Sequence, residues 1–309
     1  MFALAIMFCG MAVGFLLRAT PLPGWAGRLF MPAVMCLLLC MGLAIGANDT
    51  LMRALPTLGL RALALTLASL AGALALVMAL SRLMPWPGHA GGAAAEGVAE
   101  EGALDVSGSP MRSSLTILGL FSLGVAAGRL LALPAWLVSS DATIGPLYFL
   151  MAVVGLGLGS DPRLGRILRS LSPRVLVLPL ANMVGTLIGA ALISLVLDDT
   201  LWHCLAVGAG FAYYSLSSVL ISQTAGTELG TVALMANIMR EIITLLCAPM
   251  AARLLSPHAA IALGGASTMD TTLPIMVGTL GASWAFISIL HAMVLDFSVP
   301  FWVLFFCSL

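Results

Sequence analysis

Long apolar runs, interrupted by only a few polar residues, constrain this chain more than any other feature of its sequence. Segments such as 58–80, 174–197 and 231–255 come close to the ~20 residues that a helix needs to cross a bilayer. Of the 309 residues, 61% are hydrophobic and only 8% are charged, against roughly 25% charged residues in soluble domains. We therefore expect an all-α, polytopic membrane protein.

The apolar segments predict about eight to ten transmembrane segments. They cover 1–17, 29–47, 58–80, 113–133, 144–159, 174–197, 202–222, 231–255, 258–279 and 282–308. The segments at 202–222 and 258–279 carry glycine, proline and polar residues inside the apolar stretch. Such interruptions indicate broken or re-entrant helices, which transporters use to build binding sites at mid-membrane depth.

An internal repeat divides the chain. Gly10 and Gly14 correspond to Gly124 and Gly128, and Gly42 and Gly46 correspond to Gly155 and Gly159, at an offset of 113 to 114 residues. This pattern predicts two three-helix repeats at 1–84 and 113–200, in inverted orientation because each holds an odd number of spans. A flexible acidic linker (85–112) joins them, and a core transport region (201–309) follows. Close helix packing through small residues is the alternative explanation of the glycines, and both can hold.

Arginine placement predicts the orientation of the chain. Arg163, Arg166, Arg169 and Arg174 cluster in one loop, which we expect on the cytoplasmic side. Alternation of the preceding spans then places the N-terminus on the periplasmic side.

Ionisable residues within the last apolar segments are the candidate site. Asn237 and Glu241 are four residues apart on the 231–255 helix and share a face, whereas Arg240 points about 100° away. An unpaired carboxylate at mid-span is costly, so Glu241 is a candidate functional group. The alternative is a salt bridge from Glu241 to an arginine on another helix, such as Arg61 or Arg129.

A second acid lies in the interrupted 258–279 segment. Asp270 stands between Gly264-Gly265 and Pro274, which favour an unwound backbone, and hydroxyls surround it at Ser267, Thr268, Thr271 and Thr272. We expect a polar nest with one carboxylate. Asp270 could instead cap the half-helix that follows, by accepting from the amide of Thr272 or Leu273.

Further polar residues support this site. Tyr214, Ser215 and Ser217 give the 202–222 segment a polar face, whose hydroxyls either line a cavity or bond back to their own helix. His291 either relays protons or is a satisfied core histidine. Asp296, on the same helix, is a possible extra acid.

Other classes of protein are disfavoured. The chain has zero formal net charge and no basic patch, so we expect no nucleic-acid partner. Neither of the intramembrane protease patterns is present, and the acids and histidines lack metal-ligand spacing. We therefore predict neither an enzyme nor a metal site, and no cofactor. A receptor or scaffold without transport would not need the paired acids.

Four ordered motifs resemble the bacterial lysine exporter (LysO) family. They are Tyr214-Ser-Leu-Ser217, Asn237-x-x-Arg240-Glu241, the stretch from Gly265 to Pro274, and His291. The resemblance implies export of L-lysine and its analogue thialysine across the bacterial inner membrane, with Glu241 and Asp270 as the important acidic pair.

The sequence departs from the family pattern at several positions. Ser267-Thr268 reverses the expected order, Ala212-Tyr213 replaces the usual Gly-Trp, and Asp296 is an acid where an apolar residue is expected. These changes bear on the substrate more than on the fold.

The residues and the resemblance together predict a secondary transporter that exchanges lysine, or a related cationic amino acid, for protons. Two buried carboxylates suit the two ammonium groups of lysine, and half-helix amides between Gly264 and Thr268 would hold its carboxylate. Sodium is the alternative coupling ion, and the oligomeric state is not specified by the sequence. The rival function is a cation/proton antiporter or an organic-anion carrier, for which Arg240 would be the cavity cation.

Overall fold

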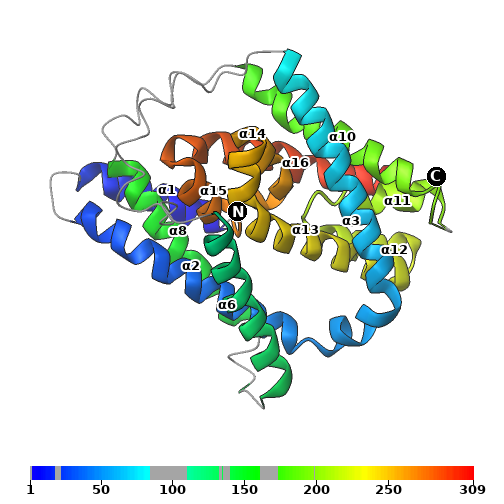
Figure 1. The fold of residues 1–309 in the computed structure, drawn as a ribbon, viewed down its shortest axis with the longest axis horizontal. Helices are drawn as coiled ribbons and strands as arrows, with labels where there is room; N and C mark the ends of the chain where they lie inside the picture. The colour runs from blue at the N-terminus through cyan, green and yellow to red at the C-terminus, as the bar shows by residue number, and fades with distance from the viewer. Residues whose placement is uncertain are drawn as a thin grey trace. The chain divides into compact units, whose positions relative to one another are not determined.

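A computed structural model describes residues 2–17, 22–83, 110–131, 134, 140–160, 173–197 and 199–309. All regular structure in these ranges is helical, as the apolar runs predict. The helices, shown in Figure 1, are α1 (Phe2–Leu16), α2 (Leu22–Gly46), α3 (Asp49–Leu83), α6 (Pro110–Leu130), α8 (Ser140–Ser160), η1 (Pro173–Leu176), α10 (Val177–Ile193), α11 (Leu201–Gly208), α12 (Tyr214–Ala225), α13 (Thr227–Leu254), α14 (Pro257–Gly264), η2 (Gly265–Met269), α15 (Leu273–Leu280), η3 (Ala282–Trp284) and α16 (Ala285–Cys307).

Three described helices are long and apolar enough to cross a membrane, namely Met52–Leu83, Thr227–Leu254 and Ala285–Cys307. Shorter apolar stretches occur in α1, α2, α6, α8 and α10, over Ala5–Leu16, Met35–Gly46, Gly119–Leu130, Ile144–Gly157 and Val177–Ile193. The total number of membrane spans stays a prediction.

Two sequence predictions fall largely outside the described residues. The linker predicted over 85–112 is not described up to residue 109, but its last three residues are helical because α6 begins at Pro110. Proline suits the first turn of a helix, where its missing N–H has no partner to lose. Of the four arginines used for orientation, only Arg174 lies in a described range.

The described chain forms two compact units. The first takes in described parts of Met1–Asp49, Gly88–Ser172 and Leu273–Phe286, and the second takes in those of Thr50–Pro87, Pro173–Thr272 and Ile287–Leu309. In the first unit, α1 packs on α8, α2 packs on α6, and α2 also touches α8. An Asp49 oxygen accepts from Arg129 at 2.7 Å in this unit.

Glycines make the helix crossings of the first unit very close. At eight of them an added Cβ would lie under 3.0 Å from a backbone atom of the facing helix. They are Gly10 and Gly14 of α1, Gly42 and Gly46 of α2, Gly124 and Gly128 of α6, and Gly155 and Gly159 of α8. These are the glycines of the sequence repeat, and they act as small-residue packing faces.

The glycines of each predicted repeat pack against a helix of the other repeat. The α1 glycines face Ala152 and Leu156 of α8, while the α6 glycines face Leu39 and Leu43 of α2. If α1 corresponds to α6 and α2 to α8, these two crossings are copies of one another. The two repeats over 1–84 and 113–200, and their inverted orientation, stay predictions.

The second unit contains the polar residues of the candidate site. Its helices α3 and α10 cross closely, because a Cβ at Gly72 would lie 2.2 Å from the carbonyl oxygen of Gly185. Fully buried Phe211 and Ile221 belong to a core cluster that also takes in Leu295 and Val299 of α16.

Both segments predicted to be interrupted contain a break. After α11, residues 209–213 are non-helical before α12 begins, and Phe211 and Ala212 have positive φ values of 45° and 76°. After α14, Gly265 has a φ of 59° and opens the short η2, and regular α-helix resumes only at Leu273. Re-entry of these segments into the membrane stays a prediction.

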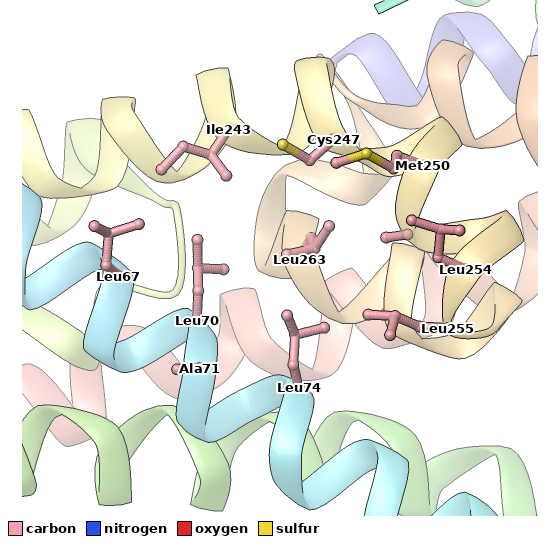
Figure 2. A pocket seen from close by; sticks show the side chains of 11 residues that line it. Leu67, Leu70, Ala71, Leu74, Ile243, Cys247, Met250, Leu254, Leu255 and Leu263 are labelled. Atoms are coloured by element: carbon pink, nitrogen blue, oxygen red, sulfur yellow. The ribbon is translucent and has the colours of Figure 1, made fainter. Parts of the chain in front are cut away.

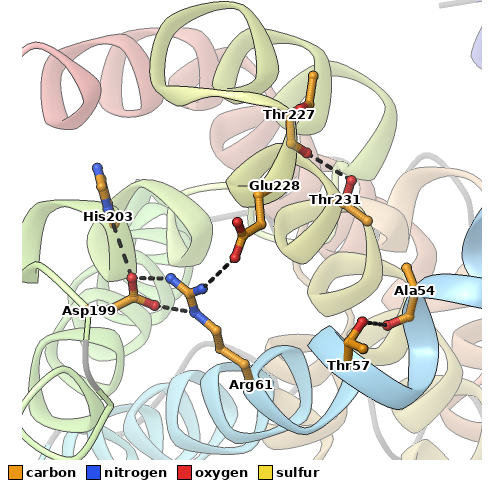
Figure 3. A network of polar contacts seen from close by, with 8 residues as sticks. All are labelled: Ala54, Thr57, Arg61, Asp199, His203, Thr227, Glu228 and Thr231. Carbon is orange, nitrogen blue, oxygen red and sulfur yellow. Dashed lines mark hydrogen bonds and ion pairs between the residues drawn. The ribbon is translucent and has the colours of Figure 1, made fainter.

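An ion-pair cluster joins α3 to the starts of α11 and α13 (Figure 3). The Arg61 guanidinium donates to both carboxylate oxygens of Asp199, and also to Glu228 at 3.4 Å. His203 Nδ1 lies 3.9 Å from Asp199. Only 7% of the Asp199 side chain is exposed, against 71% of that of Glu228.

This difference in exposure predicts unequal mutational effects. Asp199→Asn should lower the free energy of unfolding by about 1–3 kcal/mol, because a charge-assisted bond is lost where water cannot replace it. Glu228→Gln should cost about 0.5 kcal/mol or less, since exposed pairs are weak. Thermal unfolding of the detergent-solubilised variants measures both, and equal losses would contradict the unequal roles.

Candidate functional site

The two helix breaks touch each other. The amide of Ala266, at the start of η2, donates to the carbonyl oxygen of Phe211 at 2.8 Å. A Cβ at Gly265 would lie 2.4 Å from that same oxygen. A side chain there would force the two segments apart, so the Gly-Gly step is needed for this contact as well as for its positive φ. The Ala266 amide, one of those expected to hold a substrate carboxylate, is therefore occupied.

Asn237 of α13 holds the first break in place. Its Oδ1 accepts from the Ala212 amide at 2.7 Å, and its Nδ2 donates to the Ala233 carbonyl at 2.9 Å and to Ser217 Oγ at 3.4 Å. Ser217 itself bonds back to the Tyr213 carbonyl at 2.8 Å. Tyr214 and Ser215 are exposed. Ser217, which belongs to the predicted polar face, therefore bonds back to the backbone of its own segment.

The backbone at Ala212 suggests a stabilising substitution. A φ of 76° lies where an L-residue costs roughly 1–2 kcal/mol. Ala212→Gly removes this strain but adds about 0.5–1 kcal/mol of unfolded-state entropy. We expect a net gain of up to about 1 kcal/mol, visible as a higher melting temperature in detergent. Ala209→Gly, at an ordinary φ of −65°, is the matched control and should be destabilising.

Arg240 binds the end of a half-helix. Its Nε donates to the Leu263 carbonyl at 3.0 Å and its Nη2 to the Ala262 carbonyl at 3.0 Å, which are C-terminal carbonyls of α14. The other contacts are Nη2 to Asn182 Oδ1 at 3.1 Å and Nη1 to Thr186 Oγ1 at 3.3 Å. Four of its five N–H groups thus bind the protein. A cation at this position also opposes the negative end of the helix dipole.

Asn182 connects Arg240 to His291. Its Oδ1 accepts from Arg240 and from Thr186, so its amide nitrogen must be the donor to the Ala262 carbonyl at 3.0 Å and to His291 Nε2 at 2.8 Å. His291 Nε2 is then an acceptor, and the ring proton is on Nδ1, which lies 3.4 Å from Thr268 Oγ1. This hydrogen-bond network fixes the neutral tautomer and favours the satisfied core histidine over the proton relay.

Glu241 is buried without a partner. Its side chain comes from the helix that carries Asn237 and Arg240, it is 1% exposed, and neither carboxylate oxygen has a hydrogen-bond partner in the part of the chain that the structure describes. The arginines considered as partners are engaged elsewhere, Arg61 with Asp199 and Arg129 with Asp49. The structure therefore contradicts a salt bridge from Glu241 to either of these two arginines. An orphaned buried carboxylate is costly, and it is the strongest sign of function in the described chain.

Asp270 lies in the second break, directly after η2. Asp270 Oδ1 accepts from the Thr271 amide at 2.6 Å and from the Thr271 hydroxyl at 3.3 Å. The alternative in which the amide of Thr272 or Leu273 donates to Asp270 is therefore wrong. The donor is the adjacent Thr271 amide, because the tight backbone geometry after η2 brings it to the carboxylate.

The remaining hydroxyls of the break stabilise its backbone. Ser267 Oγ donates to the Gly264 carbonyl at 2.9 Å and lies 3.1 Å from Thr272 Oγ1. Thr268 Oγ1 contacts the carbonyl oxygens of Gly265 at 2.8 Å and Ser288 at 3.0 Å, which ties the break to α16. Asp296, further along α16, is half-buried.

Asn182 and Thr186 of α10 are the polar residues of this network that sequence reasoning missed. Both are fully buried, and they stand four residues apart in an otherwise apolar helix. A buried amide in a transmembrane segment marks a partner on another helix. This was the signal that could have identified them.

A groove elsewhere in the second unit lacks the chemistry of this site (Figure 2). Its volume is about 360 Å³, and its lining is hydrocarbon and sulfur, with Leu70 and Leu74 from α3, Ile243 and Cys247 from α13, and Leu263 at the end of α14. No charged side chain lines it. Because an ammonium or carboxylate group would lose its hydration there without compensation, this groove is not a site for a charged amino acid.

The apolar helices and the contacting helix breaks are typical of membrane transporters. The chain belongs to the lysine exporter LysO family, whose model matches residues 4–99 and 118–307.

Two curated proteins are similar to the chain. It is 29% identical over 237 residues to the lysine exporter LysO of Escherichia coli K12, covering 76% of this chain and 75% of that protein. It is 32% identical over 135 residues to a putative lysine exporter of Haemophilus influenzae, covering 43% of this chain and 65% of that protein. No solved structure matches the chain.

Proposed function

We propose that the protein exports L-lysine, and cationic analogues such as thialysine, from the bacterial cytoplasm in exchange for protons. The observation that carries this proposal is the carboxylate of Glu241, which is 1% exposed and has no hydrogen-bond partner among the described residues. A buried acid without a counter-ion needs a cation or a proton to offset the cost of its charge. The names of the family and of its curated relatives supply the substrate.

Alternation of cation and proton on the same acids couples the two fluxes. With lysine bound, ionised carboxylates face its ammonium groups, and after release the protonated, neutral acids are cheaper to bury than the anions. Exchange of one proton for one lysine cation moves no net charge. The proton gradient, and not the membrane potential, would then drive export. Sodium is the alternative ion, which the same acids could bind.

The organic-anion carrier is the weaker alternative. It requires a cation free to bind the substrate, and Arg240 was the candidate for that role. Four of its five N–H groups already bind Leu263, Ala262, Asn182 and Thr186, and it is buried. A guanidinium committed to its own backbone has little capacity left for a substrate anion, which favours a cation as the transported species.

Proteoliposomes loaded with radiolabelled lysine test the proposal. Efflux should accelerate when the outside is made acidic relative to the lumen, and an uncoupler should abolish the acceleration. Loading with labelled glutamate is the control for an anion carrier, and replacing external sodium by choline tests the other ion. Lysine efflux that ignores the proton gradient but requires sodium would refute proton coupling, and absence of lysine efflux would refute the substrate.

A further inference from the structure

One arginine binds both ends of the segment that contains the first helix break. Arg61 of α3 donates to both carboxylate oxygens of Asp199, just before α11, and to Glu228, in the first turn of α13, at 3.4 Å (Figure 3). A segment that crossed the membrane between these acids would separate them by about 30 Å, the thickness of the hydrocarbon core. Because one guanidinium reaches both acids, the chain between them returns to the face from which it started.

The second half of this segment, α12, runs antiparallel to α13. Near the start of α13, a Cβ at Gly230 would lie 1.8 Å from Ser222 Oγ, close to the end of α12. Further along α13, the Asn237 amide donates to Ser217 Oγ, close to the start of α12, at 3.4 Å. The chain therefore runs back along α13 after the first break.

The first half of the segment, α11, leads away from the ion pair alongside α3. At its start, Asp199 is bound by Arg61, and at its end a Cβ at Gly208 would lie 3.5 Å from Ser69 Oγ. Ser69 lies about two turns after Arg61 on α3. α11 and α12 are therefore the two arms of a hairpin, with the ion pair at its base and the first break at its tip.

The tip of this hairpin lies at about half the depth of a bilayer core. The Ala212 amide, in the break, donates to Asn237 Oδ1 at 2.7 Å. Asn237 lies ten residues after Thr227, where α13 begins, which is about 15 Å along the helix. That is half of the ~30 Å hydrocarbon core, whereas the 28 residues of α13 are enough to cross all of it.

We propose that residues 199–228 form a re-entrant hairpin, and that Arg61 is a positioning residue that closes its base and so holds the first break against Asn237 and Ala266. The bond to Asp199 is the important one, because only 7% of that side chain is exposed. The exposed Glu228 adds little. This role does not depend on which substrate the protein carries.

Side-specific labelling tests the hairpin. Leu201→Cys and Thr227→Cys change the exposed first residues of α11 and α13, and Leu255→Cys changes an exposed residue just after the end of α13. A membrane-impermeant maleimide is added to right-side-out and to inside-out vesicles, and peptide mass mapping identifies the labelled sites, so the native cysteines can stay. The first two variants should label from the same side, and Leu255→Cys from the other. Labelling of the first two from opposite sides would overturn the hairpin.

The native Cys204 reports on the ion pair at the base. It lies on α11 and is fully buried, so a maleimide reaches it only when the hairpin opens. Arg61→Gln should raise its labelling rate by about tenfold to a hundredfold, the worth of one charged hydrogen bond, while the rate at Cys247 of α13 stays the same. Arg82→Gln, at the exposed end of α3, is the matched control and should leave both rates unchanged.

Exchanging the two charges separates the ion pair from a general effect on stability. Arg61→Asp combined with Asp199→Arg should return the Cys204 labelling rate towards that of the wild type, because the pair is rebuilt with reversed polarity. Asp199→Asn is the second variant if Arg61→Gln folds poorly, and it should raise the same rate. An unchanged Cys204 rate in the folded variants, or an equal rise at Cys204 and Cys247, would overturn the positioning role of Arg61.

Discussion

Replacing Glu241 by glutamine is expected to abolish proton-driven lysine efflux while leaving the protein folded. The carboxylate has no hydrogen bond or ion pair to lose among the described residues, since both oxygens lack partners there, and glutamine fills the same space without a charge to desolvate. Stability should therefore stay the same or rise by about 1 kcal/mol. Transport should fall by about a hundredfold or more, because removing a charged binding group costs about 3 kcal/mol or more.

Efflux and melting temperature must be measured on the same preparation. Glu228→Gln is a matched control, because it makes the same chemical change on the same helix at a 71% exposed position. It should export lysine at the wild-type rate. Gradient-driven efflux that survived in Glu241→Gln would show that the coupling lies elsewhere. A large loss of stability would show instead that the carboxylate has a structural partner.

The sequence is enough to locate the helix breaks, because they depend on local chemistry. Gly265 has the left-handed backbone that favours glycine, and Pro274 lies in the first turn of α15, where proline is tolerated. Polar residues in apolar segments likewise identify Asn237, Arg240 and Glu241 as buried. Each of these inferences uses only neighbouring residues.

The sequence could not predict which groups bind the buried polar side chains, because these partners come from helices that are distant along the chain. Arg240 and Glu241 are consecutive, yet four of the five N–H groups of the arginine have acceptors, whereas the carboxylate of the glutamate has no donor among the described residues. Nothing in the local pattern distinguishes these two outcomes. The acceptors of Arg240 include backbone carbonyls of α14, which leave no mark in side-chain composition.

Arg240→Met is expected to be the most destabilising substitution in the site. It removes the side-chain donor of the Leu263 carbonyl, and it removes one of the two donors that the Ala262 carbonyl and Asn182 Oδ1 each have. Removing one member of a buried charged network costs about 3–5 kcal/mol. The loss should also release the constraint on Asn182, and with it the tautomer of His291. Arg240→Lys should recover only part of the stability, because an ammonium group cannot reach acceptors spread around a planar fork.

The measurement is thermal unfolding in detergent, together with lysine efflux from the fraction that stays folded. Arg82→Met, at the exposed end of α3, is the matched control and should change neither quantity. A structural role for Arg240 predicts a low melting temperature for Arg240→Met, with and without ligand. If Arg240 instead bound a substrate anion, the variant would melt like the wild type and lose only transport. That result would revive the anion carrier, because it would mean that the half-helix end at Leu263 does not need its cation.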